Sequence, residues 1–180
     1  MPAVEERTLK DPIEVLMREH RVIEQALAAI AAAREQDVPL SFCEDLVDFI
    51  ANFADGCHHD KEEGLLFPAM IARGMNLDVG PIAVMLHEHV LGRACVARIR
   101  EAIEAGDASA ASAAATDYAV LLQPHIAKED GVLYRMARQL LPAEEVASLA
   151  RRFEEVETSR ADSERYRELA ARLLADVSSG

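Results

Sequence analysis

The stretch "HHDKEEGLLF" at residues 58–67 returns as "HIAKEDGVLY" at residues 125–134. Five of the ten positions are identical, and three more are conservative exchanges. Both copies keep a histidine, a lysine and a glutamate at one spacing, bounded by residues that belong in a core. The repeat predicts that the chain consists of two similar halves, each with polar side chains placed for chemistry.

The repeat extends to the segments before these two stretches. "VLMREH" ends at His20 and "VMLHEH" ends at His89. The separations are similar, with 38 residues from His20 to His58 and 36 from His89 to His125. Two helical hairpins related by a pseudo-twofold axis would therefore bring four histidines and two glutamates towards one centre.

The composition favours helices, because alanine and leucine are abundant, aromatic residues make up 4% and tryptophan is absent. A chain of 180 residues is most simply one domain. The formal charge of −13 argues against a nucleic-acid partner, which would need a basic face, and against docking on an anionic membrane.

We expect a cytoplasmic protein. No apolar run approaches the length that spans a bilayer, and the N-terminal "MPAVEERTLK" lacks the core of a signal peptide. Cys43, Cys57 and Cys95 form no recognisable pair or zinc spacing, which fits reduced thiols.

Apolar spacing, capping residues and prolines predict an all-α fold, an antiparallel up-down four-helix bundle with an additional C-terminal helix. We expect a tail at 1–10, the bundle at 11–141 and the last helix with its tail at 142–180. The first expected helix begins at Asp11-Pro12 and ends before Pro39. The next three are expected at about 41–73, from 81 to near 106, and at 109–140, and the last helix at 143–177. We interpret the charged last helix as packed outside the bundle or as a surface for a protein partner or self-association.

Six polar side chains fall on the apolar stripes of these helices: His20, His58, Glu62, His89, His125 and Glu129. A buried carboxylate needs a cation, and Lys61 and Lys128 point away from the glutamates that follow them. Histidine with carboxylate suits iron, manganese or zinc, with Glu62 and Glu129 bridging a two-metal site. A polar core network in a structural bundle is the alternative interpretation.

The chain resembles the hemerythrin-like (HHE cation-binding) domain family. The resemblance rests on "REH" at 18–20, "HHDKEEGLLFPAM" at 58–70, "VMLHEHVLGR" at 84–93 and "HIAKEDGVLY" at 125–134. It implies an antiparallel four-helix bundle holding a non-haem di-iron centre, two oxo- or hydroxo-bridged irons per chain, with those six residues as metal ligands. Zinc or manganese is the alternative metal.

This sequence departs from the oxygen-carrying hemerythrins, which have a further histidine one turn before the position of His89. Met85 stands there instead. His59, whose repeat partner is Ile126, is a candidate replacement ligand, and a rim histidine is the alternative. His87 falls on another face of its helix.

The sequence allows two roles for each of two acids and two tyrosines near the stripes. We interpret Glu63 and Asp130 as solvated charges, with hydrogen bonding to ligand imidazoles as the alternative. We interpret Tyr118 and Tyr134 as core residues, with hydrogen bonding to a metal-bound oxygen species as the alternative.

The missing histidine would leave more open metal positions, which favours reactivity over reversible oxygen carriage. We therefore expect a protein that binds dioxygen, peroxide or nitric oxide, in oxidative or nitrosative stress response or sensing. The alternatives are a metal-dependent sensor or interaction module, an iron storage or delivery protein without turnover, and a zinc-bound or metal-free structural bundle. A ferritin-like site fits worse, because its signature is Glu-x-x-His. The sequence does not decide whether the protein is an enzyme.

Overall fold

The computed structural model describes residues 9–34, 36, 38–159 and 163–178, and every regular element in these ranges is helical. The predicted all-α class is therefore confirmed. Most of the expected N-terminal tail, residues 1–8, lies outside the described part of the chain.

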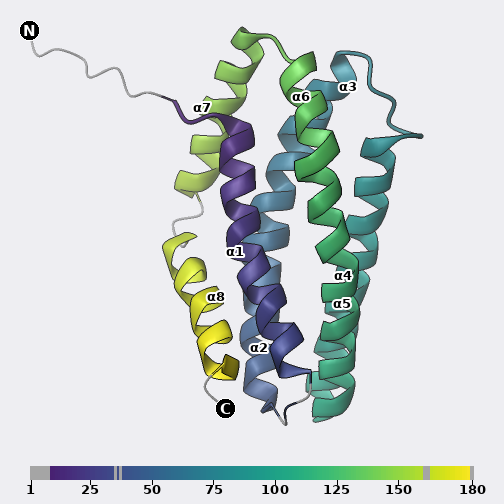
Figure 1. Ribbon diagram of the computed structural model, residues 1–180, viewed down its shortest axis with the longest axis vertical. Helices are drawn as coiled ribbons and strands as arrows, with labels where there is room; N and C mark the ends of the chain where they lie inside the picture. Colours follow the sequence, from purple (N-terminus) through teal and green to yellow (C-terminus); the bar gives the residue numbers. More distant parts are fainter. Residues whose placement is uncertain (1–8, 35, 37, 160–162, 179–180) are drawn as a thin grey trace, which may run out of the picture.

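Four helical rods lie side by side along the long axis of the molecule, and successive rods run in opposite directions (Figure 1). The first is α1 (Pro12–Ala33) and the third is α4 (Pro81–Glu104). The second and fourth rods contain π-helical segments (η). The second comprises α2 (Leu40–Phe49), η1 (Ile50–His59), η2 (Glu62–Leu66) and α3 (Phe67–Ala72), and the fourth comprises α5 (Ala108–Lys128), η3 (Glu129–Leu133) and α6 (Tyr134–Leu140).

The rod ends follow from the capping residues. The Asp11 carboxylate accepts hydrogen bonds from the backbone N–H groups of Ile13 and Glu14, at 2.8 and 3.0 Å, and so caps α1. Gly74 ends the second rod and Gly106 follows the third, with φ of 101° and 70°, a backbone conformation that glycine adopts without steric cost. These boundaries agree with the sequence predictions.

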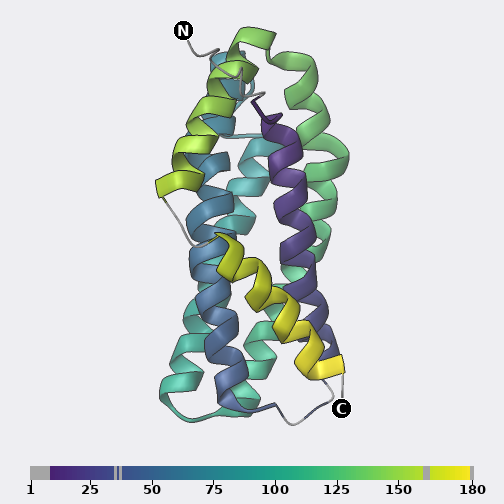
Figure 2. The same cartoon turned by 90° about the vertical axis from the view of Figure 1, so that its left-hand side faces the viewer.

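The C-terminal segment forms two helices, α7 (Ala143–Ser159) and α8 (Ser163–Ser178), which run in different directions across the bundle (Figure 2). The prediction of one continuous helix is corrected to two, and residues 160–162 lie outside the described residues. The sequence at 157–165 contains no large apolar side chain that could hold a straight helix against the bundle. Both helices pack on its outside, as expected, through buried residues that include Leu149 and Phe153 of α7 and Leu169 and Leu173 of α8.

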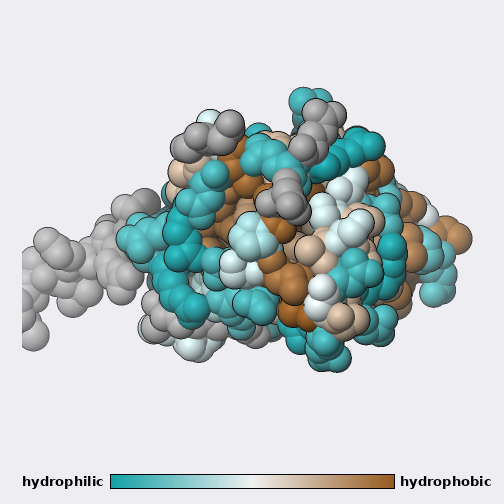
Figure 3. Space-filling model, turned by 90° about the horizontal axis from the view of Figure 1, so that it is seen from below, coloured by the Kyte–Doolittle hydropathy of each residue, from teal (hydrophilic) through white to brown (hydrophobic). Residues whose placement is uncertain are grey.

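Every rod contributes to two separate apolar clusters, which we call the upper and lower cores after Figure 1. The upper core contains Leu16, Leu66, Met85 and Leu133, and the lower core contains Ile23, Ala54, Ile99 and Leu122. Between these positions each rod carries buried polar residues, so a polar layer lies between two apolar ones. At the lower end, hydrophobic residues are visible in the middle and hydrophilic ones around much of the rim (Figure 3).

None of the described helices combines the length and the apolar character that a bilayer crossing requires.

Candidate metal centre

The polar layer contains all seven predicted site residues, and none is more than 5% exposed. Their candidate donor atoms form two groups, and within each group these atoms lie within 4.8 Å of one another. One group is His20, His58, Glu62 and Glu129, and the other is His59, His89 and His125. The structure therefore brings the six residues of the duplicated motif together with His59, which has no histidine counterpart in the second half.

The two glutamates lie between the two groups. Glu129 Oε2 is 3.2 Å from His20 Nε2 and 3.3 Å from His125 Nε2, one histidine from each group. Glu62 Oε2 likewise lies 3.7 Å from His58 Nε2 and 3.6 Å from His89 Nε2. Each carboxylate is thus placed to serve both groups.

All five histidines direct Nδ1 to a carboxylate outside the centre. The pairs are His20 with Asp130 at 2.7 Å, His58 with Glu19 at 3.0 Å, His59 with Asp55 at 3.2 Å, His89 with Glu63 at 2.7 Å and His125 with Glu88 at 2.8 Å. An ionised carboxylate only accepts hydrogen bonds, so Nδ1 carries a proton, and in the neutral imidazole Nε2 presents a lone pair to the centre. Metal-binding histidines in proteins have this arrangement. Burial lowers the pKa of His20, but its hydrogen bonds with Asp130 and Glu129 raise it to about 8, so without a cation its Nε2 is protonated as well.

Cations support these acceptor carboxylates. Lys61 bonds Glu19, Lys128 bonds Glu88, and Arg21 bonds Asp130, while Arg93 bonds Glu63 at 2.6 Å and Asp55 at 2.8 Å. The hydrogen bond from His89, with help from Arg93, lowers the pKa of Glu63 to about 2. Glu63 therefore stays ionised and accepts from the imidazole of His89.

These contacts correct one interpretation and add two residues. Glu63 and Asp130 are not simply solvated charges, because each accepts a hydrogen bond from a site histidine. Glu19 and Glu88 were missed, although each directly precedes a site histidine in the "EH" of its half. The duplication of that dipeptide was the available signal.

Several nitrogen and oxygen atoms in the centre face one another without a hydrogen-bond partner. His58 Nε2, Glu62 Oε2 and both carboxylate oxygens of Glu129 have no hydrogen-bond partner among the described residues. His89 Nε2 and His125 Nε2 lie only 3.2 Å apart. Such lone pairs repel in a buried site unless a cation or added protons lie between them. The nitrogen and oxygen donor set fits iron, manganese or zinc.

The pKa values show the same need for positive charge. Burial, and then the charge of Glu129, raises the pKa of Glu62 well above its usual range. Burial alone would also raise the pKa of Glu129, but contacts with His125 and His20 hold this pKa well below its usual value. Burial lowers the pKa of His58 well below its ordinary value, and so this imidazole is neutral.

The positions of three further residues can be compared with the sequence interpretation. Tyr134 is buried as a core residue, and its hydroxyl also donates to Glu62 Oε1 at 2.7 Å. Met85 is buried in the upper core, one turn from His89, and His87 is exposed.

Two π-helical turns begin at the two glutamates, a feature that the helical periodicity did not predict. The backbone N–H of Phe67 bonds the carbonyl oxygen of Glu62, and the N–H of Tyr134 bonds that of Glu129. Both bonds span five residues, and such turns are frequent at functional sites. The duplication therefore extends to the backbone at these two turns, whereas η1 of the second rod has no counterpart in the fourth.

Comparison with known proteins supports this description. A family model described as "Hemerythrin HHE cation binding domain" matches residues 11–137. Uncharacterized proteins of Mycobacterium bovis and of two strains of Mycobacterium tuberculosis are each 28% identical to the chain over 158 residues, covering 82% of it and 61% of the relative. The chain thus spans less than two thirds of the length of these relatives. No solved structure matches the chain significantly.

Proposed function

The chain belongs to the hemerythrin HHE cation-binding domain family, and on this premise we propose that it is a non-haem di-iron protein. The antiparallel four-helix bundle at residues 11–141 would be the metal-binding unit, and residues 142–180 its outer cover. The proposed ligands are those of the two groups, with Glu62 and Glu129 shared between two irons. Zinc or manganese would be accepted by the same donors.

The observation that carries the proposal is the set of facing lone pairs. Five imidazoles present Nε2 inwards because their Nδ1 atoms are engaged by carboxylates. The two central glutamates are 0% exposed, and three of their four oxygens have no hydrogen-bond partner among the residues described. Divalent or trivalent cations would neutralise this arrangement, whereas a purely structural core would favour apolar residues there.

The bound irons would supply the electrons and open coordination positions for reaction with dioxygen, peroxide or nitric oxide. The protein's own residues orient the imidazoles through the outer carboxylates, and the upper and lower cores exclude water from the polar layer. Tyr134 holds a proton on the hydroxyl that donates to Glu62. His59 supplies a fifth imidazole in place of the donor that Met85 does not provide, so the donor set differs from that of the oxygen carriers in position but not in number. We propose reaction with these species, in stress response or sensing, with reversible oxygen carriage as the outcome that the test below would distinguish.

A second candidate function is a metal-dependent sensor or interaction module. The observation in its favour is that α7 contacts Lys61, one of the cations that support the carboxylates around the centre. The ring of Phe153 lies 5.5 Å from Lys61 Nζ, and Lys61 holds the carboxylate of Glu19 that accepts from His58. A change at the metal would thereby reach a surface helix. We propose the cytoplasm as the compartment, on the sequence evidence alone.

The test is to reduce the iron-loaded protein under anaerobic conditions and mix it separately with dioxygen, hydrogen peroxide and nitric oxide, following the visible spectrum. We expect rapid oxidation by peroxide or dioxygen without clean reversal, or a stable nitric oxide complex. Reversible oxygenation through many cycles would instead indicate an oxygen carrier. Iron release without reaction would indicate storage or delivery.

A further inference from the structure

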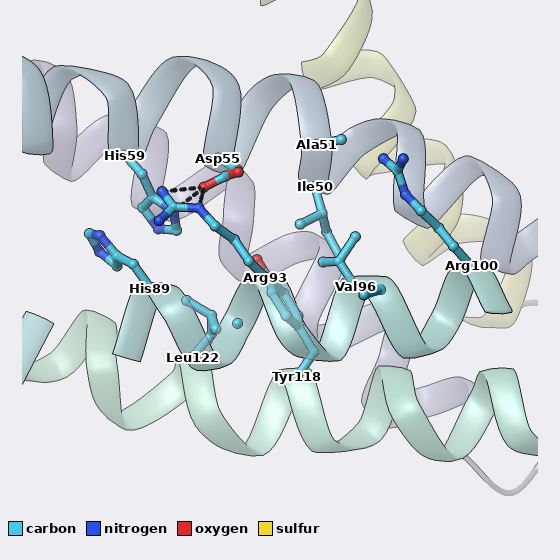
Figure 4. Close-up of a pocket in the computed structure, with 12 residues that line it drawn as sticks. Ile50, Ala51, Asp55, His59, His89, Arg93, Val96, Arg100, Tyr118 and Leu122 are labelled. Carbon is cyan, nitrogen blue, oxygen red and sulfur yellow. Dashed lines mark hydrogen bonds and ion pairs between the residues drawn. The ribbon is translucent and has the colours of Figure 1, made fainter. Parts of the chain in front are cut away.

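A cavity of about 260 Å³ lies beside the candidate metal centre, between the second rod, α4 and α5 (Figure 4). His59 and His89 line one end of it, and their rings stack on each other with centroids 3.9 Å apart. The wall also includes Ala97 and Arg100, which are exposed. The cavity therefore leads from the surface to the edge of the three-histidine group (His59, His89 and His125), which we call the second group.

The other donor group, which we call the first group, is closed off. Its members are His20, His58, Glu62 and Glu129, and none of them is among the described residues that line the cavity. Their side chains are at most 1% exposed. On the side of His58, helix α7 covers the supporting ion pair, because the Phe153 ring lies 5.5 Å from Lys61 Nζ. An ion held by the first group would thus be enclosed.

The carboxylates that accept from the imidazoles differ in exposure in the same sense. In the second group Asp55 and Glu63 are 31% and 29% exposed, and the half-exposed Arg93 holds both of them. In the first group Glu19 is only 4% exposed and bonds the fully buried Lys61. Hydrogen bonds that water reaches open at a lower free energy than buried ones. The remaining two carboxylates are similar to each other, 19% exposed for Asp130 and 16% for Glu88.

The two groups also differ in whether they can hold an ion alone. The first group supplies two imidazoles and both glutamates, with candidate donor atoms within 4.8 Å of one another. Four such donors are sufficient to hold a metal ion. The second group supplies three imidazoles and depends on the same two glutamates for negative charge. An ion can therefore leave the second group while the first group keeps its own.

We propose that the two metal ions have unequal residence times in this protein. The ion of the second group exchanges with the solution through the cavity, and the ion of the first group stays bound beneath α7. Asp55, which lines the cavity, supplies an oxygen donor along the route. This inference rests on the proposed two-metal centre and adds that one of its positions accepts and releases a divalent cation.

The experiment is metal release from the 180-residue chain, loaded with ferrous iron under anaerobic conditions or, separately, with zinc. An excess of a chromogenic chelator is added, and its absorbance reports the metal released. Native mass spectrometry counts the ions that remain in each chain. We expect two phases of equal amplitude, at least roughly tenfold apart in rate, with a one-metal chain accumulating between them.

A matched pair of variants on α4 tests the role of the cavity. Val96→Phe fills it, and we expect the faster phase to be lost, so that both ions leave slowly. Ala94→Phe adds the same ring on the exposed side of α4 and should keep both phases. Circular dichroism confirms that each variant is folded.

A second pair tests the support of the second group. Arg93→Met releases Asp55 and Glu63, and it should accelerate only the faster phase, by roughly three- to tenfold. Arg98→Met removes a guanidinium that pairs with Asp117 outside the cavity and should change neither phase. In the first group, Phe153→Ala uncovers Lys61 and should accelerate only the slower phase.

The inference is overturned if the two loaded ions leave the wild type in a single phase, or if a folded Val96→Phe releases them as the wild type does. It is also overturned if Arg93→Met accelerates both phases equally. A wild type that does not take up two ions overturns the proposed function and this inference with it. The metal content before the chelator is added thus distinguishes the two failures.

Discussion

In both halves of the molecule a lysine–glutamate ion pair supports a site histidine, but the two ion pairs lie in different surroundings. In the first half Lys61 bonds Glu19, which accepts from His58, and in the second half Lys128 bonds Glu88, which accepts from His125. The side chain of Lys61 is fully buried, whereas that of Lys128 is 42% exposed. The same local sequence thus gives one internal and one half-open ion pair.

The difference comes from α7, which has no counterpart in the duplication. Phe153 covers the Lys61 ammonium group, and Glu157 Oε1 lies 3.8 Å from it. No contact of Lys128 with α7 or α8 is found among the described residues. A duplicated motif therefore fixes hydrogen-bond partners, while burial depends on what the rest of the chain packs over them.

The largest expected effect is common to both halves. Glu62→Gln and Glu129→Gln each remove a charge from a carboxylate that lies between the two histidine groups. We expect the iron content of each variant to fall below half that of the wild type, because the buried cations lose their neutralising charge. Elemental analysis after identical loading checks this. Retention of full iron content by both variants would contradict a shared role.

The two-half organisation could be predicted from sequence because caps, prolines and inward-facing positions lie within single helices. Asp11, Gly74 and the six stripe residues are examples. Glu19 and Glu88 were not predicted, because their role depends on a neighbouring rod that helical periodicity does not place. The π-helical turns at Glu62 and Glu129 and the division into α7 and α8 also depend on tertiary packing.

The next largest effect is a difference in stability between variants of the two lysines, one in each half. Lys61→Met leaves Glu19 buried without its cation, and we expect it to lower the free energy of unfolding by about 3–5 kcal/mol. Lys128→Met affects a half-open pair and should cost about 1 kcal/mol or less. Urea denaturation of the two variants measures both values. Equal costs would show that burial under α7 does not govern the strength of the pair.

A smaller effect concerns the carboxylates supported by arginine. Glu63→Gln and Asp130→Asn keep the shape of the side chain but weaken the hydrogen bonds from His89 and His20. We expect metal affinity to fall by about 10–100-fold in each. Competition with a chelator measures the loss. The exposed Glu14→Gln, whose carboxylate pairs with Arg18 at 3.2 Å and with no site residue among those described, is the control and should change little.

The smallest expected effect tests the cover itself. Phe153→Ala removes the ring over Lys61, and the penalty of Lys61→Met should then shrink by about 1 kcal/mol, the scale of a partly buried cation–π contact. Phe49→Ala, a fully buried phenylalanine of the lower core, is the matched control. A double-mutant cycle in urea gives the coupling energy. A coupling as large with Phe49 as with Phe153 would indicate general destabilisation.

The most direct test of the central claim is the metal content and visible spectrum of the 180-residue chain after anaerobic loading with ferrous iron and exposure to air. We expect about two irons per chain, the stoichiometry of carboxylate-bridged di-iron bundle proteins, with charge-transfer bands of a bridged ferric pair. Zinc alone, or no metal after loading, would contradict the di-iron account and leave a structural bundle.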